Sequence, residues 1–327
     1  MRVLVTGSIA FDIFFRYEGS FIQGISMESI QNLSMSFRMR NRTKAYGGTG
    51  ANTAWNLRLL GGDPLLYSTV GEDGGEYLER MRGIGMDTAH VKMLDGCFTA
   101  CAIIATDQQS HQITFFHSGA DDLRPALDLP REIVEDISYA IVQPTPPAIA
   151  LQSLEWCADR EIPTIFDPGQ ELLSFQEDEL WRAIELSSGL TVNSYEWSIL
   201  QNRLHVQPEE LVQDTIFAED FGRTMQFVIV TKGGEGFALY EPGRSETFPA
   251  CPVENVVNPT GAGDGFRGGL LTGLNNGWTL EQSAKLGSAL ASKIVEQESA
   301  ILESLDVPAI VRLAEKTYGE TLPTLPA

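Results

Sequence analysis

A carboxylate lies beside a glycine-rich turn in residues 258–274, NPTGAGDGFRGGLLTGL. Residues 253–257 predict a short buried strand, which Pro259 closes. Apolar residues then recur at helical spacing, which predicts a helix that begins near Gly261. The first turn of a helix has unpaired N–H groups and a partial positive charge, so it binds anions. Glycines at 261 and 263 would let a phosphate oxygen approach the backbone closely.

Asp264 falls in the first turn of that helix, beside the expected anion site. An aspartate at this position often only stabilises the helix dipole. A carboxylate would repel a bound phosphate, but it would be useful if it removed a proton from a hydroxyl that attacks the phosphate. Two other phosphate-binding loops are excluded, because the chain has no GxxxxGKS or GxxxxGKT sequence and Phe266 takes the third glycine position of the dinucleotide fingerprint.

Polar and glycine-rich stretches follow several predicted strands. From residue 139 onward the chain alternates strand and helix, and strands at 164–166, 190–192 and 227–231 are followed by DPGQ, NSYE and KGGEG. The carboxyl ends of parallel strands share one edge of a sheet, where ligands bind. We therefore expect these stretches to meet at one site.

The N-terminal part has a similar arrangement. A strand is expected over residues 2–9, and Asp12 after it either caps a turn or contacts a ligand. Gly47 and Gly48 form a hinge before an amphipathic helix, and Asn52 falls in the first turn of that helix. Such an Asn is often only a local hydrogen-bonder. It also suits a vicinal diol, since one amide donates to one hydroxyl and accepts from another.

Two insertions interrupt the α/β pattern, at about residues 13–46 and 95–118. Both contain alternating polar and apolar residues without a clear helix, which predicts a small β-sheet that projects from the core as a lid. Phe115 and Phe116 in the second insertion either pack in the core or stack on a substrate. The first insertion has a basic cluster, which is either a solvated strand face or helps to attract an anion: Arg38, Arg40, Arg42 and Lys44.

The composition is that of a soluble globular protein, with 43% hydrophobic and 20% charged residues among 327. A net charge of −21 argues against nucleic acid and anionic membranes as partners. The 4 cysteines lack CxxC spacing, so we expect buried free thiols, and the 4 scattered histidines give no ligand cluster. With no apolar run of membrane length, we expect a cytoplasmic protein.

The order of these motifs resembles the ribokinase-like (PfkB) family of sugar and nucleoside kinases. The resemblance covers the whole chain: an early Asp, GGxxxN, NxxE, TKGGEG and the GAGD helix. It implies a three-layer α/β/α ribokinase-like core with a small β-sheet lid, as one kinase domain over residues 1–327. It also implies ATP and Mg²⁺ as cofactors, with a monovalent cation such as K⁺ as a further candidate.

The resemblance also implies roles for individual residues. Asp264 is the expected base, and the expected anion hole consists of Gly261, Ala262 and Gly263. Nucleotide contacts are expected from Asn193, Thr231, Lys232, Gly233, Gly236, Gly261 and Gly263. The NxxE motif implies Mg²⁺ binding, through water, by Asn193 and Glu196. The hydroxyls of the acceptor would be held by Asp12, Gly48 and Asn52.

Within the family, several stretches are most similar to bacterial adenosine kinases: GSIAFD (7–12), LSMSF (33–37), FDPGQ (166–170), NSYEW (193–197) and GDGFRGGLLTG (263–273). This likeness adds Ser8, Ser36 and Gln170 to the acceptor site, and Phe116 as a ring that stacks on adenine. The segment after Asp167 lacks the Asn and Arg of many sugar kinases, and Asn258-Pro259 replaces the usual Asp-Thr. The cation at the transferring phosphate is left open, with Lys232 as the nearest candidate.

The expected reaction is ATP-dependent phosphorylation of the 5′-hydroxyl of a nucleoside, most specifically adenosine to AMP in purine salvage. The alternatives are the same chemistry on a free sugar such as ribose or fructose, and a non-catalytic nucleoside-binding protein. The presence of Asp264 argues against a non-catalytic binding protein, because binding alone gains nothing from the charge of this carboxylate. An exposed lid sheet could also pair edge to edge in a homodimer.

Overall fold

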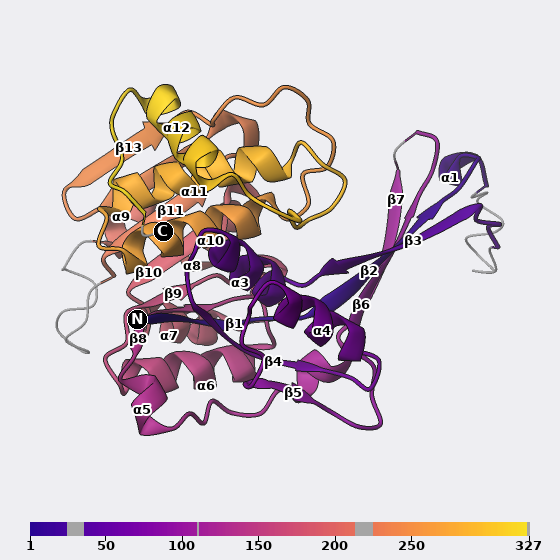
Figure 1. Ribbon diagram of the computed structural model, residues 1–327, viewed down its shortest axis with the longest axis horizontal. Helices are drawn as coiled ribbons and strands as arrows, with labels where there is room; N and C mark the ends of the chain where they lie inside the picture. The colour runs from indigo at the N-terminus through magenta and orange to yellow at the C-terminus, as the bar shows by residue number, and fades with distance from the viewer. Residues whose placement is uncertain (25–35, 110, 213–224, 326–327) are drawn as a thin grey trace.

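The centre of the molecule is a nine-stranded sheet with the strand order β13-β12-β11-β10-β9-β8-β1-β4-β5 (Figure 1). This computed structural model describes residues 1–24, 36–109, 111–212 and 225–325. Strands β8 to β11 and β1, β4 and β5 pair in parallel, whereas β12 and β13 extend the sheet as an antiparallel hairpin. The strands of this sheet are β1 (Arg2–Thr6), β4 (Pro64–Val70), β5 (Val91–Met93), β8 (Ile137–Val142), β9 (Thr164–Phe166), β10 (Gly189–Asn193), β11 (Phe227–Thr231), β12 (Phe237–Glu241) and β13 (Arg244–Phe248).

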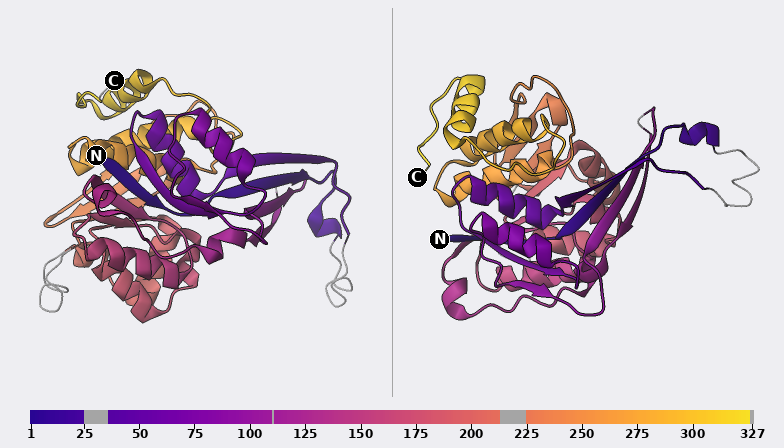
Figure 2. Two further views of the ribbon diagram at one scale, coloured as in Figure 1. Left: turned by 60° about the horizontal axis from the view of Figure 1, so that its bottom comes forward. Right: turned by 45° about the vertical axis from the view of Figure 1, so that its right-hand side comes forward.

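Helices cover both faces of this sheet, which gives three layers (Figure 2). One face carries α3 (Thr49–Leu59), α4 (Gly75–Gly83), α10 (Ala262–Asn275), α11 (Leu280–Ile294) and, outside α11, α12 (Val307–Tyr318). The other carries α6 (Pro147–Ala158), α7 (Glu177–Glu185) and α8 (Ser194–Leu204). Two single-turn helices, α5 (Arg131–Val134) and α9 (Pro208–Leu211), complete the core. The expected three-layer α/β/α core is confirmed.

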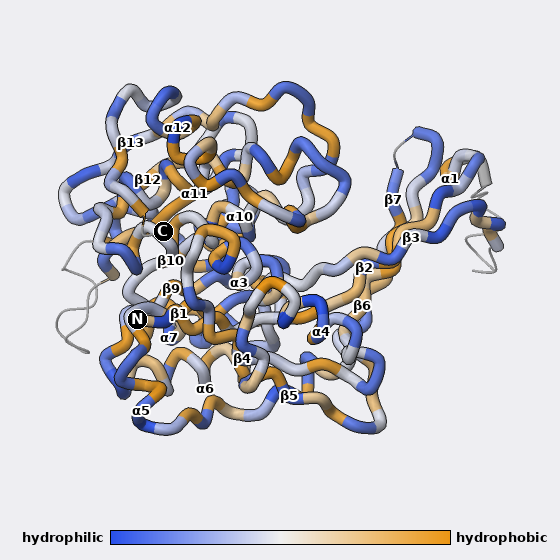
Figure 3. Tube along the Cα trace, in the orientation of Figure 1, coloured by the Kyte–Doolittle hydropathy of each residue, from blue (hydrophilic) through white to orange (hydrophobic). Residues whose placement is uncertain are grey.

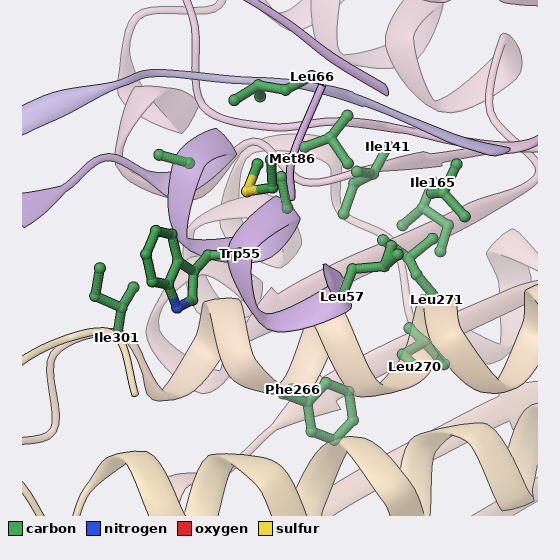
Figure 4. Packing of buried hydrophobic residues seen from close by; sticks show 14 of the residues in the cluster. Trp55, Leu57, Leu66, Met86, Ile141, Ile165, Phe266, Leu270, Leu271 and Ile301 are labelled. Atoms are coloured by element: carbon green, nitrogen blue, oxygen red, sulfur yellow. The ribbon is translucent and has the colours of Figure 1, made fainter. Parts of the chain in front are cut away.

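The core between the sheet and the first helical layer fixes α3 against α10. Apolar residues line the central strands in the hydropathy trace (Figure 3). Trp55 and Leu57 of α3 and Phe266 and Leu270 of α10 are buried in one cluster with residues of the central strands (Figure 4). A Cβ at Gly268 would lie 2.8 Å from Asn56 Cβ, so this glycine lets the two helices approach closely. This contact brings the first turns of α3 and α10 together.

The two predicted insertions form a separate sheet with the order β3-β2-β6-β7, which we call the lid sheet. It consists of β2 (Ala10–Arg16), β3 (Asn41–Gly47), β6 (Ala100–Thr106) and β7 (Gln112–His117), and α1 (Phe21–Gly24) follows β2. Figures 1 and 2 show that it projects from the core on the side away from both termini. The predicted small sheet is confirmed. Of the LSMSF stretch, residues 33–35 lie outside the described residues, and Ser36 is exposed.

The structure differs from the sequence-based expectations at two places, one with a strand fewer and one with an additional hairpin. The strand expected at 253–257 is wrong: this segment is irregular, and Val256 and Val257 are 65% and 51% exposed. Pro252 and Pro259 bracket it, and proline cannot donate a ladder hydrogen bond. The hairpin of β12 and β13 was not predicted, because β12 (FALYE) and β13 (RSETF) lack the alternation of polar and apolar residues that marks a half-buried strand.

All 4 cysteines are free, as expected, but only Cys157 and Cys251 are buried. Cys97 and Cys101 are half-buried. In the described residues, no helix is long and apolar enough to cross a membrane.

Candidate active site

The N-terminus of α10 has the geometry that the glycine pattern predicts. The helix begins at Ala262, and Gly261 before it has φ 85°, a left-handed conformation that favours glycine. Asp264 lies in the first turn and is 7% exposed. The structure therefore places a nearly buried carboxylate directly after the candidate anion hole.

Asn52 and Asp264 are hydrogen-bonded, although 212 positions separate them in the sequence. Asn52 Nδ2 donates to Asp264 Oδ2 at 2.8 Å, and Asn52 Oδ1 is buried with no partner among the described residues. Burial raises the pKa of Asp264 to about 6, against the lowering effects of Arg267 and of the Asn52 hydrogen bond. Asp264 is therefore ionised at neutral pH and still basic enough to accept a proton.

Asp12 lies where β2 leaves the core, and not in a loop after β1. Burial and the nearby charge of Asp264 raise the pKa of Asp12 to about 6. Gly48 has φ 93°, and a Cβ there would lie 2.5 Å from Ser8 O, so the turn into α3 requires glycine. Ser8 Oγ accepts a hydrogen bond from Thr49 N at 3.2 Å. The predicted acceptor residues Ser8, Asp12, Gly48 and Asn52 thus meet between β1, β2 and the first turn of α3.

A buried ion pair between Asp167 and Arg267 was not predicted. Arg267 Nη2 donates to Asp167 Oδ1 at 2.7 Å, and Arg267 Nε lies 2.5 Å from Asp167 Oδ2. Burial raises the pKa of Asp167, whereas the Arg267 guanidinium lowers it. A usable signal existed in the sequence: Asp264 and Arg267 are three positions apart in a predicted helix, so they share a face.

Next to α10, a cleft of about 640 Å³ runs along the carboxyl ends of β9, β10 and β11. The polar residues of its lining include Asp167, Asn193, Glu196 and Arg267, and the apolar residues include Pro252, Val253, Val256, Ala291 and Val295. Thr231, Gly233, Gly236, Ala262 and Gly263 also line it, which brings together most of the residues expected to contact the nucleotide. The irregular segment 252–256 therefore forms one wall.

The remaining predicted residues lie elsewhere or at the margin. Gln170 lines the same cleft, with Asp167, although it was expected at the acceptor. The described lining of the cleft includes Thr231 and Gly233 but not Lys232 between them. Phe116 is 47% exposed on β7, the outer strand of the lid sheet, and Ser36 lies before β3.

Asn193 and Glu196 form a capping box at the start of α8. Asn193 Oδ1 accepts from Glu196 N at 2.9 Å, and Glu196 Oε2 accepts from Asn193 N at 2.7 Å. Among the described residues, no group of three or more His, Cys, Asp or Glu side chains could hold a metal ion. Mg²⁺ commonly keeps several waters and uses few protein ligands beside phosphates. A single carboxylate on the cleft wall, already a hydrogen-bond acceptor, fits contact through water.

Sequence comparison matches residues 3–307 to the pfkB family carbohydrate kinases. A nucleoside kinase of Methanocaldococcus jannaschii is 29% identical over 273 residues, which cover 83% of this chain and 86% of that protein. The structure of Burkholderia thailandensis nucleoside kinase in complex with inosine aligns with TM-score 0.83 and 31% identity over 98% of this chain and 99% of that one. The structure of the Methanocaldococcus jannaschii nucleoside kinase aligns with TM-score 0.81 and 26% identity, and the alignment covers 96% of this chain and 98% of that one.

Proposed function

The chain belongs to the pfkB family of carbohydrate kinases, and we propose that it transfers the γ-phosphoryl group of ATP to the 5′-hydroxyl of a nucleoside. The observation that carries the proposal is the Asn52–Asp264 hydrogen bond. It joins the proposed base, whose pKa is raised, to an amide whose Oδ1 has no partner among the described residues, across the first turns of α3 and α10. Relatives named nucleoside kinases support the acceptor class.

In the proposed step, the 5′-oxygen of the nucleoside attacks the γ-phosphorus and forms a new P–O bond. The bond from that phosphorus to the β–γ bridging oxygen breaks, and ADP leaves with the electron pair. Asp264 accepts the hydroxyl proton, since its carboxylate is ionised at neutral pH. The amides of Gly261 and Gly263 stabilise the charge on the moving phosphoryl group, and Ala262 N, which donates to Pro259 O at 3.2 Å, would join them by exchanging that bond.

The nucleotide is proposed to lie in the cleft, with its base against the apolar residues and its phosphates toward α10. Thr231, Gly233 and Gly236 contact it from the loop after β11. Mg²⁺, which neutralises phosphate charge when bound, would be held through water by Asn193 and Glu196. K⁺ stays a further candidate from the family resemblance.

Within nucleosides, we propose adenosine as the acceptor, with AMP as product. Support comes from the stretches similar to bacterial adenosine kinases and from the relative whose structure contains inosine, another purine nucleoside. Asp12, Gly48 and Asn52 would hold the ribose, with Ser8 beside them. We propose that residues 1–327 form one kinase domain. Closure of its lid sheet would bring Phe116 onto the base.

We also propose a homodimer in which edge strands of the lid sheet pair. Residues 112–117 of β7 are largely exposed, including Phe115 at 66%, which leaves an uncovered edge that a second copy could use. The four unpaired cysteines suit a reducing cytoplasm as its location. Size-exclusion chromatography with light scattering tests the dimer, and a monomer at all concentrations would contradict it.

The test of the function is ADP release on mixing the protein with ATP, Mg²⁺ and one acceptor: adenosine, inosine, ribose or fructose. We expect the nucleosides to exceed the sugars by at least about 10²-fold in kcat/KM, because base stacking of about 3 kcal/mol would favour them. Equal or better turnover of a free sugar would support a sugar kinase instead. Nucleoside binding without ADP release would support a non-catalytic binding protein.

Phe116→Ala tests the stacking ring, with Phe115→Ala as its matched control. The two rings are adjacent on β7 and therefore point to opposite faces of the lid sheet. Phe116→Ala should lower kcat/KM for adenosine while leaving slow sugar phosphorylation unchanged. If Phe115→Ala has the larger effect, the stacking ring is on the other face.

A further inference from the structure

Arg267 places a positive charge directly beside the candidate anion hole. Its side chain is 13% exposed, and a Cβ at Gly263 would lie 2.5 Å from Arg267 Nη1. The guanidinium therefore lies against the first turn of α10. Among the residues described as lining the cleft, Arg267 is the basic side chain, whereas Asp167 and Glu196 are acidic.

This charge matters because the surroundings are otherwise negative. Asp264 and Asp12 interact with each other at the proposed acceptor site, and the whole chain has a net charge of −21. A nucleoside triphosphate is itself polyanionic, and charges a few ångströms apart interact strongly in a partly buried site. Helix N–H groups and a metal held through water would have to overcome that repulsion. Lys232, the candidate from the sequence, is not part of the described cleft lining.

Asp167 fixes the orientation of the guanidinium. It contacts Nη2 and Nε, and it is itself held by Gln143 Nε2, which donates to Asp167 Oδ2 at 3.3 Å. Asp167 is 1% exposed. With that side of the guanidinium occupied, Nη1 is directed to Gly263 and lies 3.9 Å from Asp264 Oδ1. The free edge of the guanidinium is thus between the base and the anion hole.

We propose that Arg267 contacts the transferring phosphoryl group through Nη1 and stabilises its charge, and that Asp167 is the positioning residue that holds Arg267 there. This inference rests on the proposed kinase function. The simpler alternative is that the ion pair only stabilises the fold. If the ion pair only stabilises the fold, variants of Arg267 should change the stability of the protein but not the kinetic parameters of its folded state.

Steady-state kinetics separates these alternatives. Arg267→Gln should lower kcat by about 10²- to 10³-fold, as expected for loss of one charged donor at a transition state. The KM for the nucleoside should change little, because Arg267 faces the phosphate side of the site. Arg124→Gln is the matched control, since Arg124 also forms a buried ion pair, with Asp121, outside the described cleft lining. It should lower stability and leave kcat unchanged.

A double-mutant cycle tests the positioning role. Asp167→Asn should lower kcat by about 10-fold, and the Asp167→Asn, Arg267→Gln double variant should be no slower than Arg267→Gln alone. Additive losses would show that Asp167 acts independently of Arg267 and would overturn the positioning role.

A binding experiment keeps the inference testable without turnover. Calorimetric titration compares ADP with AMP-PNP, a non-hydrolysable ATP analogue that adds the γ-phosphate. Wild type should prefer AMP-PNP, and Arg267→Gln should lose most of that preference, while Arg124→Gln keeps it. If wild type phosphorylates no nucleoside but this pattern holds, the proposed function fails and only the contact of Arg267 with the γ-phosphate stands.

If Arg267→Gln does not fold, Arg267→Lys and Arg124→Lys replace the pair, because lysine keeps the charge. Arg267→Lys should lower kcat by about 10-fold, since a point charge reproduces the guanidinium fork only in part. Unchanged kcat and an unchanged preference for AMP-PNP in a folded Arg267 variant would overturn the proposal.

Discussion

Asn52 Nδ2 donates a hydrogen bond of 2.8 Å to Asp264 Oδ2, across the contact between α3 and α10. The bond joins the residue proposed to recognise the acceptor with the residue proposed to deprotonate it. Because Asn52 Oδ1 has no partner among the described residues, the same amide could accept a hydrogen bond from a substrate hydroxyl. One side chain would then orient both the substrate and the base.

The pH dependence of the reaction follows from Asp264. A base must be ionised, so kcat/KM should be constant at neutral pH and fall as the pH drops through about 6, the raised pKa of Asp264. Asn52→Leu removes the hydrogen bond that lowers this pKa, so the acidic limb should move to higher pH. A pH profile of kcat/KM for both proteins checks this, and an unmoved limb would mean that another group controls it.

The Asp264→Asn variant should be less active than the wild type but more stable. The folded state binds the Asp264 proton more tightly than the unfolded chain, with a pKa of about 6 against 3.8. The carboxylate is therefore neutral in both states below 3.8, and it costs stability as the pH rises through 6. At pH 7.5 the variant should be more stable by up to about 3 kcal/mol, from two pKa units.

Denaturant unfolding at two pH values checks this prediction. The advantage of Asp264→Asn should be present at pH 7.5 and shrink toward pH 4, where the wild-type carboxyl is protonated. A variant that is less stable at both pH values would contradict the cost assigned to the buried charge.

Gly48→Ala should disturb the start of α3 and the joint with the lid sheet. A left-handed φ costs a non-glycine residue on the order of 1–3 kcal/mol. The added Cβ would also lie 2.5 Å from the carbonyl oxygen of Ser8. Gly243→Ala is the matched control, because Gly243 has φ 74° and nothing within 4 Å of its would-be Cβ. Only Gly48→Ala should raise KM and lower kcat, and equal kinetics in both variants would remove Gly48 from the site.

Much of the fold could be predicted because its signals are local. The strands at 164–166, 190–192 and 227–231 and the helix after Gly261 follow from periodicity and from glycine or proline at their ends. The strand expected at 253–257 is wrong because its valines resemble a strand in composition, whereas the segment pairs with no described strand and prolines flank it. Tertiary pairing, which the local pattern does not encode, decided that segment.

The site was predictable in part for the same reason. Asp264, Asn52 and the glycines stood out because a carboxylate, an amide and glycines without a Cβ fall together at the starts of two predicted helices. The Asp167–Arg267 pair was missed because it joins residues 100 positions apart, and a buried ion pair has no sequence signature of its own. Only the i, i+3 spacing of Asp264 and Arg267 hinted at a cation on that face.

The most direct test of the central claim is single-turnover phosphorylation of adenosine by wild type and Asp264→Asn, with ATP and Mg²⁺ saturating. Asp178→Asn is the matched control, since Asp178 is an exposed aspartate in the first turn of another helix, α7. We predict that Asp264→Asn lowers the rate by about 10²- to 10⁴-fold, with adenosine affinity nearly unchanged, while Asp178→Asn has the wild-type rate. A near-normal rate in Asp264→Asn would remove this carboxylate from the mechanism and contradict its proposed role as the base.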